Sequence, residues 1–108
     1  MEAHGCNTSA LRDPAKVEAL FQQMVRELSL HPLHDTTMHK FAGEGGVTGF
    51  VMLTESHLAC HTFPEFGSLC LNLFCCRPRD DWNFAEYLQR EFAASSVQVR
   101  RVERPYRP

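Results

Sequence analysis

The sequence lacks any apolar run near the roughly 20 residues needed to cross a bilayer, so we expect no membrane-spanning helix. It also lacks an excess of one charge: 11 basic and 13 acidic residues leave a formal net charge of -2, which gives no basic surface for nucleic acid. The N-terminus has no basic region followed by an apolar stretch, so we expect no secretion signal. Disulfides are not expected either, because the five cysteines are odd in number and three lie inside strand-like apolar runs. These absences indicate a cytoplasmic protein without a nucleic-acid or membrane partner.

What the sequence does contain fits one folded unit. Its 108 residues allow one hydrophobic core but not two, and a content of 44% hydrophobic and 22% charged residues is ordinary for a globular domain. No internal repeat or low-complexity linker divides the chain. We therefore expect a single domain over residues 1–108.

The N-terminal third predicts a strand and a helix. Residues 2–5 read as the end of a strand, which either is short or begins upstream of Met1. Asp13 then caps a helix whose first turn holds Pro14, where the missing N–H costs nothing. Apolar residues follow at helical spacing and form one stripe: Val17, Leu20, Phe21, Met24, Val25 and Leu28.

The middle of the chain predicts antiparallel strands joined by short turns. The turns are a glycine-rich segment at 43–46 and a second segment at 64–68. The strands are expected over residues 36–41, 47–54, 57–63 and 69–75.

The C-terminal part predicts a second helix and a last strand. Asp80 and Asp81 are expected to cap the helix. Its buried side is expected to carry Phe84, Leu88 and Phe92, with Tyr87 alongside, and the last strand Val97, Val99 and Val102. The element order predicts an α+β fold, a two-layer sandwich of mainly antiparallel sheet with two helices packed on one face.

Residues of chemical interest gather around one serine. Glu55, Ser56 and His57 follow a hydrophobic strand, His61 lies further along, and two adjacent cysteines end the next strand. Three readings compete with catalysis by self-cleavage. The polar cluster could be an ordinary strand end with core histidines. It could be a zinc site of His57, Cys60, His61 and Cys76, although a C-x2-C pair is missing. It could be a serine hydrolase, although no G-x-S-x-G turn is present.

Self-cleavage between Glu55 and Ser56 is the fourth reading. The serine hydroxyl attacks the preceding carbonyl and converts the amide into an ester. Elimination of that ester leaves dehydroalanine, which hydrolyses to an N-terminal pyruvoyl group. The reaction needs a donor to polarise the Glu55 carbonyl and a base to remove the Ser56 α-proton, for which Thr48 and His61 are candidates.

The segment ESHLACHTFPE, with LFCC further along, closely resembles the ESH-x3-HT(W/F)PE signature of the bacterial and archaeal S-adenosylmethionine decarboxylase proenzymes. The resemblance implies a pyruvoyl-dependent carboxy-lyase that supplies polyamine synthesis. It implies that Ser56 becomes the pyruvoyl cofactor, that His61 removes the α-proton and that Cys76 protonates the substrate carbon after CO2 leaves. Thr48 matches a serine that steadies the processing intermediate. Substrate-binding positions matched by the resemblance are Phe41, Leu58, Phe63 and Glu65.

The resemblance also implies a dimer of cleaved protomers and no metal. Three alternatives stay open for individual residues. His57 is expected to be a hydrogen-bonded partner or a sheet residue, and Phe41 and Phe63 could be core residues. Strand alternation decides which adjacent cysteine faces the site, and the family spacing selects Cys76. The remaining cysteines are expected to be small buried residues, namely Cys60, Cys70 and Cys75.

The sequence departs from the family pattern where a substrate would bind. Phe63 replaces a common tryptophan, Asn72 replaces a common acidic residue, and the turn before Val47 is longer than usual. Losing an acidic side chain removes a partner for a cationic ligand. Arginine or ornithine therefore remain possible substrates, and an unprocessed, non-catalytic partner of an active paralogue is the alternative from another class.

Overall fold

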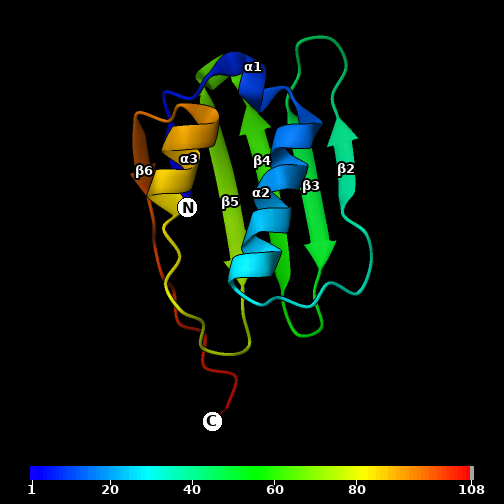
Figure 1. Cartoon of the computed structure of the whole chain (residues 1–108), viewed down its shortest axis with the longest axis vertical. Coiled ribbons are helices and arrows are strands. Elements are labelled where there is room, and N and C mark those ends of the chain that lie inside the picture. The colour runs from blue at the N-terminus through cyan, green and yellow to red at the C-terminus, as the bar shows by residue number, and fades with distance from the viewer. Residues whose placement is uncertain (108) are drawn as a thin grey trace.

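Six antiparallel strands form one sheet with all helices over the same face, as the computed structural model in Figure 1 shows for residues 1–107. The strands follow the order β2-β3-β4-β5-β1-β6 across the sheet. Their bounds are Glu2–His4 (β1), Thr37–Lys40 (β2), Val47–Met52 (β3), His57–Phe63 (β4), Ser68–Phe74 (β5) and Ser96–Gln98 (β6). The predicted α+β two-layer arrangement is confirmed.

The N-terminal strand does not lie beside its neighbours in sequence. Strand β1 is inserted between β5 and β6, with Glu2 opposite Cys70 on one side and Gln98 on the other. The sheet therefore interleaves strands from the two halves of the chain, since β1, β2 and β3 precede Glu55 and β4, β5 and β6 follow it.

The long helix α2, Pro14–Glu27, is the predicted one. The Asp13 carboxylate accepts a hydrogen bond of 2.9 Å from the backbone N–H of Ala15, which satisfies one of the free donors of the first turn. The helix packs on β3 and β2, and the approach is close at Gly49: a Cβ there would lie 3.0 Å from a methyl of Val17. The helix and the sheet enclose the core between them.

Two further helices differ from the prediction. A short helix α1, Thr8–Leu11, was not predicted, so the face carries three helices instead of two. One turn is too short for a repeating apolar stripe, although its Asn7 cap accepts from Ala10 N at 3.0 Å. Helix α3, Phe84–Phe92, is capped by Asn83, and the prediction of Asp80 and Asp81 as caps was wrong.

The C-terminal strand is shorter than predicted. Strand β6 ends at Gln98, and Val99 and Val102 are exposed by 52% and 73%. Their assignment to a strand was wrong because the chain leaves the sheet where its charged tail begins. Arg100 then pairs with Glu2 at 2.8 Å, on the solvent-exposed side of the tail. Within residues 1–107, none of the helices is long and apolar enough to cross a membrane.

The sheet face opposite the helices is covered by no element among residues 1–107, and we call it the open face. Strand alternation places Phe50 on β3 and Phe74 on β5 there, exposed by 41% and 38%. Cys70 lies on this face and is exposed, so its prediction as a buried residue was wrong. Cys60, one strand away on the helix side, is buried as predicted, and Cys75 is half-buried.

Candidate active site

The predicted cleavage bond lies in the tight turn that joins β3 to β4. The backbone N–H of Leu53 donates to the Ser56 carbonyl at 2.9 Å and closes this turn. Thr54 fixes it from outside, since both its N–H and its hydroxyl donate to the His31 carbonyl, at 3.0 and 3.2 Å. Ser56 is half-buried and Glu55 is exposed. The turn is therefore held in one conformation while its serine still has space to react.

The segment after β5 lies against this turn. Arg77 Nε donates to a carboxylate oxygen of Glu55 at 3.0 Å, which joins the residue before the bond to the residue after Cys76. The strand register agrees, because Phe74 is opposite His57 and the two chain segments continue side by side.

The two adjacent cysteines have different surroundings. Burial raises the pKa of the Cys75 thiol, and the guanidinium of Arg79 beside it acts in the opposite direction. Arg79 also lies 3.5 Å from the carbonyl oxygen of Leu28, at the end of α2, so Cys75 faces the helix layer. Cys76 lies in a bend after the end of β5 and directly precedes Arg77, which contacts Glu55 of the cleavage turn. The choice of Cys76 by the family spacing stays a prediction.

A second group of polar residues lies further along β4. Thr48 on β3 and His61 on β4 are opposite each other in the register, and Thr48 Oγ1 lies 3.0 Å from Nδ1 of His61. The hydroxyl can donate to the ring nitrogen or accept from it, so it fixes the plane of the imidazole. Both side chains lie on the open face.

Ser56 and His61 are not brought together within one chain. Ser56 precedes the first residue of β4, His57, whereas His61 is four residues further along the strand, roughly 13 Å at the usual rise per residue. The candidate site therefore consists of two parts on the same face. One part holds the cleavage bond and Cys76, and the other holds Thr48 and His61.

Three of the predicted substrate-binding residues lie at the His61 end of the sheet. Phe41 follows β2, is 51% exposed and touches the His39 ring edge-on, with centroids 4.6 Å apart. Phe63 ends β4 half-buried, and Glu65 is exposed in the 3-10 turn η1, Pro64–Phe66. The side chain of Leu58 has no exposed surface and faces the helices, so any substrate contact of this residue has to come from its backbone.

His57 is stacked between two aromatic rings on the open face. Its ring lies 5.3 Å from that of Phe74 at 4° and 5.9 Å from that of Phe50 at 28°. The stack crosses β3, β4 and β5 next to the cleavage turn. It agrees with the reading of His57 as a sheet residue, and it stiffens the strand end that carries Ser56.

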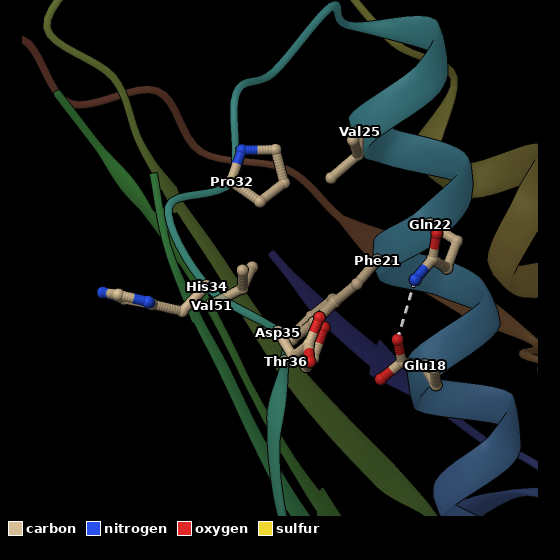
Figure 2. Close-up of a pocket in the computed structure, with 9 residues that line it drawn as sticks. All are labelled: Glu18, Phe21, Gln22, Val25, Pro32, His34, Asp35, Thr36 and Val51. Atoms are coloured by element: carbon tan, nitrogen blue, oxygen red, sulfur yellow. Dashed lines mark hydrogen bonds between the residues drawn. The ribbon is translucent and has the colours of Figure 1, made fainter. Parts of the chain in front are cut away.

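A cavity elsewhere in the molecule is unrelated to this chemistry. This cavity of about 230 Å³ lies between α2 and the segment 32–36. Figure 2 shows its lining residues, among which the Gln22 amide donates to Glu18; the two atoms are 2.8 Å apart. None of the predicted catalytic residues lines it. Within residues 1–107, no three histidine, cysteine or carboxylate side chains are grouped so as to hold a metal ion. Of the zinc ligands considered from the sequence, Cys60 lies on the helix side of β4, whereas His57 and His61 lie on the open face.

Sequence reasoning missed the residues that hold the turn. Arg77 and His31 are 22 and 23 residues from their partners, and no periodicity links them to the cleavage bond. The only sequence feature that pointed to either contact was the basic residue Arg77 directly after Cys76.

Comparison with known proteins agrees with the motif. The profile of a family described as S-adenosylmethionine decarboxylase matches residues 1–105. An S-adenosylmethionine decarboxylase proenzyme of Moorella thermoacetica is 36% identical over 104 residues, which is 95% of this chain and 82% of the relative. Proteins of the same name from Carboxydothermus hydrogenoformans and Shouchella clausii are 34% and 33% identical, covering 95% and 99% of this chain and 80% and 82% of the relatives. The similarity thus includes both parts of the candidate site.

Proposed function

Because this chain belongs to the S-adenosylmethionine decarboxylase family, we propose that it is a carboxy-lyase that decarboxylates S-adenosylmethionine for spermidine and polyamine synthesis. The proposal includes self-cleavage of a zymogen between Glu55 and Ser56. The observation that carries it is the closed turn, which presents a half-buried serine hydroxyl directly after an exposed glutamate, at the start of β4.

The residues present fit a pyruvoyl cofactor made from the chain itself. A serine follows the bond to be cut, an oriented hydroxyl–imidazole pair lies on the same face, and a thiol follows the neighbouring strand. The pyruvoyl group supplies the electron-withdrawing carbonyl that loss of CO2 requires. The proposed roles are nucleophile for Ser56, base for His61 with Thr48 holding its ring, and proton donor for Cys76.

The separation of Ser56 from His61 supports a dimer. A base that lies roughly 13 Å along the strand beyond His57, the residue after Ser56, cannot take the Ser56 α-proton within one chain. Two chains related by a two-fold axis, with their open faces together, would bring each Ser56 toward the other chain's His61. The exposed aromatic rings of Phe50 and Phe74 give such a contact an apolar surface.

Substrate choice would depend on the His61 end of the open face. A sulfonium ligand is attracted to an aromatic face such as Phe41, and Glu65 adds an exposed carboxylate there. Asn72 lies on the same face with a neutral amide where relatives commonly have an acid. The five free cysteines suit a reducing compartment, which supports a cytoplasmic location.

Intact-mass measurement of the purified protein tests the proposal. We expect two fragments, 1–55 and 56–108, with pyruvoyl at the start of the second. Release of CO2 is then compared for S-adenosylmethionine, arginine and ornithine in parallel, and we expect it with the first. One uncut chain without CO2 release would instead indicate a non-catalytic partner of an active paralogue.

A further inference from the structure

The cleavage turn has a positively charged neighbour that the reaction described so far does not use. Arg77 lies beside the turn and contacts Glu55, the residue whose carbonyl takes part in the cleavage. Its Nε donates at 3.0 Å to one oxygen of the Glu55 side chain. Within residues 1–107, no other hydrogen bond of this guanidinium is present, so four of its five N–H groups remain available.

The cleavage reaction creates a new negative charge at the same residue. After Ser56 Oγ has displaced the amide nitrogen, an ester joins this oxygen to the Glu55 carbonyl carbon. In the elimination step a base takes the Ser56 α-proton and a Cα=Cβ double bond forms. The Cβ–Oγ bond breaks, and its electron pair leaves with the Glu55 carboxylate. A second carboxylate therefore develops next to the side chain that Arg77 already holds.

We propose that Arg77 is a positioning residue for self-cleavage, holding Glu55 by its side chain and stabilising the carboxylate that leaves in the elimination step. This role rests on the proposed function. A fixed cation near a developing anion accelerates a reaction because it is already oriented when the charge appears. The planar guanidinium suits this role, since it can bind one carboxylate and still present further N–H groups to another.

A purely structural role explains this ion pair less well. The Arg77 and Glu55 side chains are 71% and 51% exposed, and ion pairs of such exposure add little to the stability of a fold. The turn is already fixed by the backbone bond between Leu53 and Ser56 and by the anchor of Thr54 on His31. Removing Arg77 is therefore expected to change the cleavage rate with little change in melting temperature.

The experiment follows cleavage of freshly synthesised full-length chain by intact mass. Arg77→Ala is compared with wild type, with Arg77→Lys, and with Arg12→Ala. Arg12 is a matched control because it forms an exposed ion pair of 3.3 Å with Glu44, before the start of β3 and thus at the opposite end of the sheet. Hydroxylamine is added to parallel samples, because it cleaves an accumulated ester and yields a fragment 56–108 that begins with serine instead of pyruvoyl.

For Arg77→Ala we expect cleavage about tenfold slower than wild type, equivalent to ~1.4 kcal/mol, with an ester that hydroxylamine reveals. Arg77→Lys should retain most of the rate, and Arg12→Ala all of it. In a Glu55→Gln background, the Arg77→Ala effect should become smaller, because the contact between the two side chains is already weakened.

Two results would overturn the proposal. Arg77→Ala could cleave at the wild-type rate, or it could slow without any hydroxylamine-sensitive ester, which would exclude the elimination step. Failure of the wild-type chain to cleave is a different outcome, since it would overturn the proposed self-cleavage itself and this role with it.

Discussion

Thr48 Oγ1 on β3 lies 3.0 Å from the imidazole Nδ1 of His61 on β4. The two residues face each other across the register of the strands, so the contact is fixed by the sheet and does not depend on a loop. A hydroxyl in this position holds the ring, and when it accepts from Nδ1–H the other ring nitrogen is free to act as a base.

Removing this hydroxyl should slow self-cleavage. We expect Thr48→Val to cleave at least about tenfold more slowly than wild type, because the imidazole loses its orienting partner. Thr48→Ser keeps the hydroxyl and should retain most of the rate. Intact mass against time gives the rates, and Thr37→Val on the exposed strand β2 serves as the control. Equal rates for the valine and serine variants would remove Thr48 from the mechanism.

The two adjacent cysteines should behave differently. We expect Cys76→Ala to cleave but to release CO2 about 100-fold more slowly, or to protonate its product incorrectly, since it lacks the proposed acid. Cys75 faces the helix layer beside Arg79, so Cys75→Ala should keep the activity. The measurement is CO2 release and product analysis for both variants. A defect in the Cys75 variant alone would show that the Cys75 side chain, and not that of Cys76, faces the site.

Thr62 should be important for stability, not for chemistry. Its hydroxyl donates to the Leu11 carbonyl at 2.6 Å and accepts from Val47 N–H at 2.7 Å, and the residue is only 6% exposed. Thr62→Val leaves both backbone groups without partners, which should cost about 1–3 kcal/mol of unfolding free energy. Urea unfolding of uncleaved Ser56→Ala protein measures it, with Thr37→Val as the exposed control. A loss no larger than in that control would contradict the assignment.

The stability of the fold should fall at alkaline pH because of Cys60. Burial raises the pKa of this thiol from 9.0 to about 12, and the nearby Cys70 acts in the same direction. The unfolded chain therefore releases this proton before the folded chain does. The contribution is fully present below pH 9 and is lost progressively between pH 9 and about 12.

This prediction is measured as urea unfolding at pH 7.5 and 10 in the Ser56→Ala background. Relative to Cys60→Ala, the chain with Cys60 should lose about 1 kcal/mol more between the two pH values. Cys70→Ala is the control, since its thiol is exposed. The same loss in both cysteine variants would show that Cys60 does not cause it.

The elements with a strong repeating pattern were predictable. Strand β4 has the predicted bounds, because buried and exposed side chains alternate up to Pro64, where the backbone N–H is lost. Helix α2 begins where the Asp13-Pro14 pair predicts. The exposure of Cys70 could also have been predicted from the sequence. Its neighbours Leu69 and Leu71 mark the buried face of β5, so Cys70 has to lie on the opposite face.

The features that could not be predicted depend on contacts between residues distant in sequence. The cap of α3 is Asn83 because the segment between β5 and this helix remains irregular for longer than the pair Asp80-Asp81 suggests. The hydrogen bond from Arg77 to Glu55 joins the turn before β4 to the segment after β5. These two segments lie together only because of the register of β4 and β5. The motif supplied the candidate residues of the site, whereas their division into two parts depends on the length of β4.

The position of β1 between β5 and β6 has a consequence for the cleaved protein. If the bond after Glu55 breaks, the first fragment contributes β1 between two strands of the second fragment, as well as β3 along β4. Separating the fragments would then require breaking three strand interfaces at once. Unfolding becomes a dissociation whose midpoint rises with protein concentration, and refolding requires two molecules to meet. Maturation would thus convert a chain that folds alone into an interlocked pair whose assembly is second order.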